Sequence, residues 1–268
     1  MDFRGRHVLI TGASSGLGLE MARELARTHG AHLVLVARRR ERLEELRDEL
    51  ERRYGVQVAV VVADMTRAED VDRVVDEATH GRELYAAILN AGVTFFGHAL
   101  EIPDNELRAL VETNVVSTTR LANAFARYLI ERQNGGGVML VSSVAGVSPL
   151  PYQAAYAATK AFLNSYGQAL AEELRGRGVT ISTFAPGGID TEMLQKSGIT
   201  SSSSSLAAFL MPADRCARLA IEGFRARKTF FVPGPLYKLT ALVSRVAPQG
   251  IVTWQAANIY RGSLPKRG

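Results

Sequence analysis

Residues 8–18 constrain the fold more than any other part of this chain. Residues 8–10 are apolar and include β-branched side chains, which is typical of a strand buried on both faces. A Gly-rich stretch over 11–16 follows, and a helical pattern begins near Leu17. Glycine permits positive φ angles and close contact with a ligand, and the free N–H groups at a helix start attract an anion. The segment therefore predicts a strand, a turn and a helix that hold a phosphate group.

Apolar strand patterns alternate with helical patterns through residue 184. Further strands are expected at 31–37, 56–62, 85–89, 137–143 and 179–184, and helices at 41–53, 67–79, 103–133 and 154–175. Such alternation is typical of an α/β fold with a doubly wound, Rossmann-like parallel sheet, in which ligands bind beyond the carboxyl ends of the strands. We expect a single catalytic domain over 1–234, ending with a helix at 212–227 and a strand at 229–232, and a helical extension over 235–268.

The end of the second expected strand indicates which dinucleotide is bound. An acidic residue at this point binds the ribose 2′-hydroxyl of NADH, whereas an arginine binds the 2′-phosphate of NADPH. Ala37 stands where the acid is expected, and Arg38 follows it. NADPH is therefore favoured over NADH, and the alternative is a helix start that is merely basic.

Polar and small residues follow the next strands. Asp64 could cap the following helix or accept a hydrogen bond from the adenine amino group, and the two interpretations are compatible. Residues 90–92, Asn-Ala-Gly, would let a flat ring lie against the backbone. Asn114 falls among apolar residues in the middle of an expected helix, where asparagine is unfavourable, so we expect its side chain to have a polar partner.

Tyr156 and Lys160 lie one helical turn apart, on one face of the helix expected over 154–175. A neighbouring ammonium lowers the pKa of a phenol, which lets Tyr156 exchange a proton with a carbonyl oxygen near neutral pH. Ser143, at the end of the preceding strand, could hydrogen-bond the same oxygen, and Ser142 is the alternative to it. Tyr152 has no lysine four residues on, so we expect it to line the substrate mouth or to pack there.

Together these motifs resemble the short-chain dehydrogenase/reductase family, over about residues 4–195. Residues 11–18 match its TGxxxGxG turn, residues 90–92 its NAG motif, residues 156–160 its YxxxK motif and residues 186–191 its PGxxxT loop. The thirteen-residue interval from Ser143 to Tyr156 is the usual one in this family, which favours Ser143 over Ser142. One small departure is Leu89, which stands where the family usually has another asparagine.

The resemblance implies an NADP(H)-dependent oxidoreductase that reduces a ketone or aldehyde to an alcohol, reversibly, by hydride transfer. Its catalytic residues would be Asn114, Ser143, Tyr156 and Lys160. In this family the asparagine holds a proton-relay water, and the lysine also holds the nicotinamide ribose. The expected cofactor-binding residues are Gly12, Ser14, Ser15, Gly16, Leu17, Gly18, Arg38, Asp64, Met65, Asn90, Ala91, Gly92, Tyr156, Lys160, Pro186, Gly187, Ile189 and Thr191. No metal is expected, and the family suggests a homodimer or homotetramer built on the helices that start near 103 and 154.

After Thr191 the family has a substrate lid, expected here over about 192–211. The Ser-rich tip at 201–205 suggests disorder without a ligand, and apolar residues over 206–211 could close an apolar cover. These residues indicate a hydrophobic carbonyl substrate, such as a steroid, an acyl thioester or a xenobiotic ketone, without ranking them.

The extension over 235–268 carries apolar residues at helical spacing, beginning with Leu236 and Leu239. It could pack on the domain, contact another subunit or lie on a membrane surface. The polar face carries few cations, so packing or a subunit contact is favoured over the membrane.

Composition removes other classes of function. The net charge is +5, but the basic residues are interleaved with Glu, as over 39–45, so no nucleic-acid partner is expected. Cys216 is the single cysteine and is expected to be buried, and no apolar leader or membrane-length run is present, so we expect a cytoplasmic protein. The main alternative is a dinucleotide-binding redox-sensing regulator without turnover, which would have no need of a tuned phenol. An epimerase or dehydratase of the longer family branch is disfavoured by the turn spacing and the length.

Overall fold

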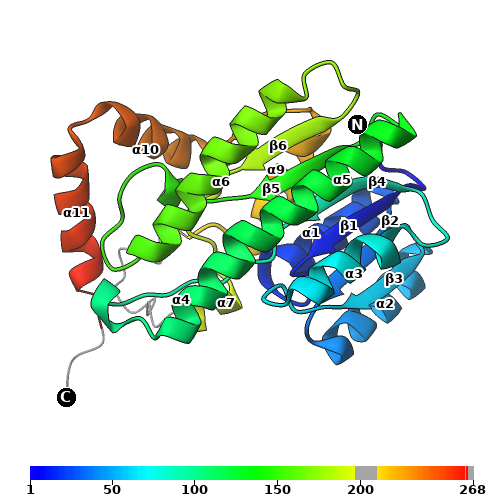
Figure 1. The fold of residues 1–268 in the computed structure, drawn as a ribbon, viewed down its shortest axis with the longest axis horizontal. Coiled ribbons are helices and arrows are strands. Elements are labelled where there is room, and N and C mark those ends of the chain that lie inside the picture. Colours follow the sequence, from blue (N-terminus) through cyan, green and yellow to red (C-terminus); the bar gives the residue numbers. More distant parts are fainter. Residues whose placement is uncertain (197–209, 263, 265–268) are drawn as a thin grey trace.

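A seven-stranded parallel sheet with strand order β3-β2-β1-β4-β5-β6-β7 runs through the molecule (Figure 1). The computed structural model describes residues 1–196, 210–262 and 264. The strands are β1 (His7–Thr11), β2 (His32–Ala37), β3 (Val58–Val62), β4 (Leu84–Leu89), β5 (Gly137–Val141), β6 (Thr180–Phe184) and β7 (Phe230–Phe231). This single-domain, Rossmann-like α/β architecture confirms the predicted fold class.

Helices cover both faces of the sheet. Along β1, Val8 and Ile10 pack in one core cluster with side chains of α1, α2 and α9, whereas Leu9 packs in a second with α3 and α5. All three residues are 0% exposed, which explains the uninterrupted apolar run in the sequence. The longer helices are α1 (Gly16–His29), α2 (Arg40–Tyr54), α3 (Ala68–Thr79), α4 (Asp104–Val111), α5 (Thr118–Arg132), α6 (Ala154–Glu173), α9 (Ala213–Arg225), α10 (Pro235–Val246) and α11 (Gln249–Arg261). Short turns of 3-10 helix, η1 (Ala99–Glu101) and η3 (Val144–Gly146), complete the order with α7 (Glu192–Lys196).

The helix expected over 103–133 is not continuous. A π-helical segment, η2 (Glu112–Ser117), separates α4 from α5, and Pro103 is the N-cap of α4 rather than its first residue. Just after this segment, the Thr118 hydroxyl at the start of α5 donates to the Thr113 carbonyl, five residues earlier. One wider turn of this kind changes the direction of side chains along the helix, and such turns are frequent at functional sites.

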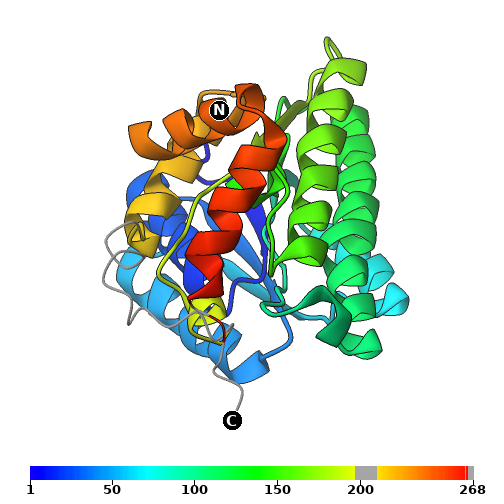
Figure 2. The same cartoon turned by 90° about the vertical axis from the view of Figure 1, so that its left-hand side faces the viewer.

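The last two helices stand at one end of the molecule, where they face the viewer in Figure 2. α10 packs on the chain's own domain, because Ala241 is buried and the Tyr237 hydroxyl donates to the Gly188 carbonyl at 3.2 Å. Much of the apolar surface of both helices is nevertheless exposed, and α11 has no buried residue in the part of the chain described. Among the described helices, none is long and apolar enough to cross a membrane.

The expected lid lies partly outside the described residues. Of the expected 192–211, α7, Leu210 and Met211 are described, and the Ser-rich tip with Leu206 and Phe209 is not. The segments before and after the expected lid lie side by side, because Ile189 and Met211 form a parallel β-bridge. Met211 N–H donates to Gly188 O at 2.9 Å. Cys216 is buried on α9, as predicted, and burial raises the pKa of its thiol to about 12.

Candidate active site

A cavity of about 1210 Å³ lies at the carboxyl ends of the strands. It begins at the Gly-rich turn after β1, passes Ser143 and Tyr156, and reaches α10 and α11. Ligand pockets commonly measure about 300–1,000 Å³, so this cavity has room for a dinucleotide together with a small organic substrate. Its position follows the rule for doubly wound sheets.

The Gly-rich turn folds tightly against the motif after β4. Gly12 and Gly16 have φ angles of +69° and +54°, a backbone region that favours glycine. A Cβ on Gly18 would lie 2.4 Å from the Gly12 carbonyl oxygen and 2.6 Å from Asn90 Nδ2, so a larger residue cannot fit there. Asn90 Nδ2 donates to the Thr11 carbonyl at 3.0 Å, which ties the two motifs together.

The turn presents the start of α1 to the cavity. Ser15 is the N-cap, its side chain makes no cap hydrogen bond among the described residues, and the first turn has no acidic residue there either. The first N–H groups of the helix are therefore available to an anion, and the positive end of the helix dipole favours one. This half of the cavity fits a dinucleotide, because its floor consists of glycines and a helix start.

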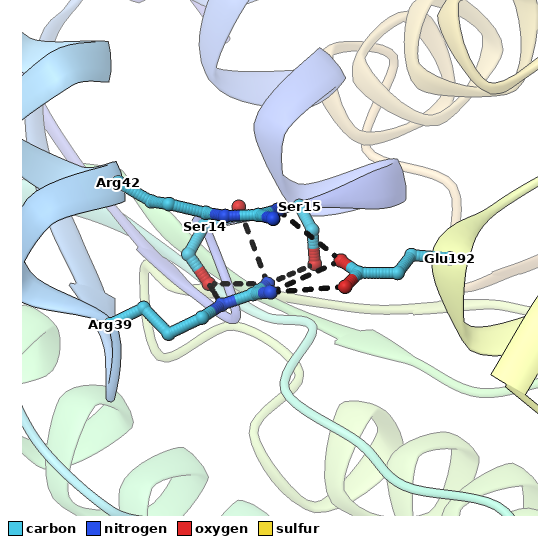
Figure 3. A network of polar contacts seen from close by, with 5 residues as sticks. All are labelled: Ser14, Ser15, Arg39, Arg42 and Glu192. Atoms are coloured by element: carbon cyan, nitrogen blue, oxygen red, sulfur yellow. Dashed lines mark hydrogen bonds and ion pairs between the residues drawn. The ribbon is translucent and has the colours of Figure 1, made fainter.

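Besides the predicted Arg38, which lines the cavity, the neighbouring Arg39 contacts the Gly-rich turn (Figure 3). Its Nη2 donates to the hydroxyls of Ser14 at 3.1 Å and Ser15 at 2.8 Å, and its Nη1 donates to Glu192. Sequence reasoning missed both Arg39 and Glu192. The signals were weak, since Arg39 is one of three consecutive arginines and Glu192 simply follows the PGxxxT loop.

Arg38 lines the cavity and is largely exposed to solvent. Its side chain is 66% exposed, and its Nη1 lies 3.8 Å from Asp64 Oδ2. Asp64 Oδ1 accepts hydrogen bonds from the N–H and hydroxyl of Thr66, at 3.0 and 2.9 Å. Asp64 thus stabilises the turn that leads into α3, whose own N-cap is Arg67, and it also lines the cavity where adenine is expected.

Tyr156, Ser143 and Lys160 meet in the middle of the cavity. Tyr156 and Ser143 both line the cavity there, and Lys160 Nζ lies 5.7 Å from the centre of the Tyr156 ring. The Ser143 hydroxyl donates to the Pro186 carbonyl at 3.3 Å. Lys160 is 4% exposed and donates to the Val141 carbonyl at 3.0 Å. Ser142, by contrast, donates to the Lys160 carbonyl at 2.9 Å, and Ser143 is the serine whose side chain affects the pKa of the phenol.

The pKa of Tyr156 departs from the sequence prediction. Desolvation by the surrounding protein raises the pKa of the Tyr156 phenol to about 12, and the hydrogen bond with Ser143 offsets this only in part. Burial also lowers the pKa of Lys160 to about 8, because removal from water disfavours the charged ammonium relative to the neutral amine. The expectation of a lowered pKa for the Tyr156 phenol is therefore wrong. Near neutral pH the phenol keeps its proton.

Asn114 lies behind the cavity wall, 1% exposed in the π-helical segment. Its Oδ1 accepts from Val93 N–H at 2.9 Å, and its Nδ2 donates to the Val93 carbonyl at 2.9 Å and to the Thr159 hydroxyl at 3.1 Å. These are the polar partners that its position predicts. A Cβ on Gly92 would lie 3.2 Å from Asn114 Oδ1 and 3.6 Å from Lys160 Nζ, so the three residues converge.

Tyr152 packs beside the site, which was one of its two expected roles. The Tyr152 and His98 rings pack edge to face, with their centroids 5.3 Å apart. The Tyr152 hydroxyl accepts a hydrogen bond from Arg261 Nε at 3.4 Å. Tyr260 of α11 reaches the cavity and packs near Phe96, a contribution that sequence reasoning missed.

Apart from Gly18 and Asn114, the predicted residues line the cavity: Gly12, Ser14, Ser15, Gly16, Leu17, Arg38, Asp64, Met65, Asn90, Ala91, Gly92, Ser143, Tyr156, Lys160, Pro186, Gly187, Ile189 and Thr191.

Known proteins share this sequence and geometry. A family model described as short chain dehydrogenase matches residues 6–201. The chain is 32% identical to 17-beta-hydroxysteroid dehydrogenase type 3 of Rattus norvegicus over 229 residues, which span 81% of this chain and 74% of that protein. A 7beta-hydroxysteroid dehydrogenase structure matches with a TM-score of 0.85 at 25% identity, covering 96% of this chain and 100% of that one. The short-chain dehydrogenase from Sphingobium yanoikuyae in complex with NADPH matches with a TM-score of 0.80 at 30% identity, covering 98% of each chain.

These matches extend over both halves of the cavity and over most of the chain. The matched family segment, residues 6–201, contains the Gly-rich turn and the Tyr156–Lys160 pair. The chain belongs to the short-chain dehydrogenase/reductase family, the NAD(P)-dependent oxidoreductases that act on CH–OH and C=O groups.

Proposed function

We propose that this chain is an NADPH-dependent carbonyl reductase, reversibly an alcohol dehydrogenase, that acts on a hydrophobic ketone or aldehyde. The observation that carries the proposal is that Tyr156, Ser143 and Lys160 lie together in the cavity that begins at the anion-binding turn. Bound NADPH would supply a hydride, so the protein has to orient the substrate and move a proton.

The protein residues perform the proton step. The hydroxyls of Tyr156 and Ser143 both hydrogen-bond the carbonyl oxygen, and their dipoles stabilise the negative charge that develops on it. Tyr156 then donates its proton to that oxygen, for which a phenol that is protonated near neutral pH is suited. Lys160, with a pKa lowered to about 8, lies behind the ring and can return a proton at the same pH. Asn114 is a positioning residue, because it holds Val93 and Thr159 around this group.

NADPH is favoured by the arginines that follow β2. Ala37 stands where an acid would bind the 2′-hydroxyl of NADH, Arg38 and Arg39 follow it, and Arg39 contacts two serines of the phosphate-binding turn. The NADPH complex of the Sphingobium yanoikuyae relative supports the same cofactor.

The far end of the cavity supports a hydrophobic substrate. Its wall contains Leu210 before α9, Leu239 and Val243 of α10, and Ile259 of α11. Two similar proteins, one from rat, are named for hydroxysteroids, and this supports a bulky apolar carbonyl for this chain.

An oligomer through α4, α5 and α6 remains a prediction. Val111 of α4, Val116 of η2 and Phe162 of α6 are 40%, 37% and 41% exposed, and these side chains supply apolar surface for a second copy.

Replacing the phenol tests the proposal. Tyr156→Phe should lower kcat for NADPH-driven ketone reduction at least about 100-fold, because it removes the proton donor. The dissociation constant for NADPH should change less than about twofold, since Tyr156 lies away from the anion-binding turn. Tyr152→Phe is the matched control, which loses a hydroxyl bonded to Arg261 outside the catalytic group and should keep normal turnover. Near-normal turnover of Tyr156→Phe on a broad ketone panel would refute the proposed role.

A further inference from the structure

The Arg39 guanidinium lies between the phosphate-binding turn and α7 (Figure 3). On one side it donates to the hydroxyls of Ser14 and Ser15. On the other side its Nη1 donates to both carboxylate oxygens of Glu192, at 3.1 and 3.2 Å. Arg42 Nη1 adds a second contact to the same carboxylate at 3.4 Å. Glu192 therefore supplies an anion to a cluster that otherwise consists of guanidinium groups and hydroxyls.

The surroundings of this carboxylate are those of a phosphate site. Two arginines that converge on one anion, next to serine hydroxyls, form the donor set that binds phosphate monoesters. The start of α1 adds its dipole to the same region. The Glu192 side chain is 28% exposed and that of Arg39 is 36% exposed, so the ion pair is partly shielded from water.

We propose that Glu192 competes with the 2′-phosphate of NADP(H) for Arg39 and thereby sets how strongly the enzyme prefers NADP(H) to NAD(H). This inference rests on the proposed NADPH-dependent function. A 2′-phosphate carries enough charge to replace the carboxylate at Arg39 and Arg42, whereas the neutral 2′-hydroxyl of NAD(H) does not. Glu192 thus reduces NADP(H) affinity and leaves NAD(H) affinity nearly unchanged.

The exchange also connects the coenzyme to the substrate side of the cavity. Glu192 is the first residue of α7, and the preceding Thr191 packs on the turn, with its methyl 3.2 Å from the place of a Cβ on Gly16. The β-bridge between Ile189 and Met211 holds the chain just before this helix. Release of Glu192 from Arg39 therefore removes an ion pair between α7 and the residues next to the turn, while the β-bridge between Ile189 and Met211 remains.

Replacing Glu192 by its neutral isostere tests the competition. Dissociation constants of NADPH and NADH are measured by fluorescence titration for the wild type, Glu192→Gln and Glu49→Gln, without a carbonyl substrate. Glu192→Gln should bind NADPH at least about fivefold more tightly and change NADH affinity less than about twofold. Glu49→Gln is the matched control, because it removes one negative charge from a bidentate pair with Arg23 at 3.1 and 2.7 Å, away from the turn. It should change neither constant by more than about twofold.

Adenosine 2′,5′-bisphosphate is the second probe, since it carries the ribose phosphate without the nicotinamide. It should also bind Glu192→Gln at least about fivefold more tightly, and adenosine 5′-monophosphate should not. Equal gains for NADPH and NADH would overturn the assignment, because the carboxylate would then compete with the pyrophosphate common to both. No gain for either coenzyme would overturn the competition itself while leaving ketone reduction by the wild type intact. A wild type that prefers NADH and reduces no ketone with NADPH would instead contradict the proposed function.

Discussion

The two ends of the cavity are built from different kinds of contact. At the coenzyme end, glycine backbone conformations, hydrogen bonds and a helix start define the walls, and Thr11 and Gly18 are buried. At the substrate end, α10 and α11 supply apolar side chains, among which Leu239 and Ile259 are 59% and 57% exposed. Directional contacts of the first kind accept one shape of ligand, whereas apolar side chains exchange for one another at small cost. The coenzyme end therefore identifies its ligand class, and the substrate end leaves many apolar carbonyls possible.

The largest expected effect comes from adding one methyl group at the coenzyme end. Gly18→Ala should lower the free energy of unfolding by about 3 kcal/mol and abolish saturable NADPH binding, because its Cβ would lie 2.4 Å from the Gly12 carbonyl. Gly250→Ala in α11 makes the same change where nothing lies within 4 Å of the new Cβ. It should raise the free energy of unfolding by about 0.5–1 kcal/mol, since alanine favours a helix. Urea unfolding of both variants measures the contrast, and equal effects would remove the distinction between the two ends.

A smaller effect is expected from the buried amine. The pKa of Lys160 is lowered to about 8 in the folded chain, below its ordinary value of 10.5. Between these values the unfolded chain binds a proton that the folded chain lacks, so stability rises with pH. The free energy of unfolding of the wild type relative to Lys160→Met should therefore increase by about 2 kcal/mol from about pH 8 to about pH 10. A difference that stays constant over this range would mean that burial does not lower the pKa of Lys160.

The smallest effect is expected at the substrate end. Leu239→Gln should raise KM for a bulky apolar ketone about fivefold, with kcat changed less than about twofold, because it removes apolar contact with the substrate. The free energy of unfolding should change by at most about 0.5 kcal/mol, since the side chain is largely exposed. Leu242→Gln is the control, because Leu242 has the same 59% exposure on the same helix and lies outside the lining of the described cavity. If both variants raise KM equally, the wall assigned to Leu239 is wrong.

The sequence predicted the coenzyme end well because local rules govern it. The strand, the Gly-rich turn and the helix after it depend on residues close together in the chain, and the structure has them as expected. The contact of Arg39 with the serines of the turn was different, because the backbone at the end of β2 decides which neighbouring side chain faces the turn. Glu192 lies more than 150 positions from Arg39, so no local pattern could pair them.

Burial explains the other differences. The presence of Lys160 in the next helical turn suggested a lowered pKa for Tyr156, but desolvation depends on atoms from many segments and reversed the direction. The π-helical turn around Asn114 likewise depends on contacts with the segment at Val93, which the helical pattern of residues 103–133 does not contain.

The contact between Tyr237 and the PGxxxT loop has a consequence for the integrity of the enzyme. A Cβ on Gly187 would lie 2.0 Å from Tyr237 Cε1, so the aromatic ring of α10 rests directly on that loop. Removal of residues 235–268 would therefore take the Tyr237 ring away from this loop and open that side of the cavity to water. The terminal helices therefore help to enclose the cavity, even though much of their apolar surface is exposed.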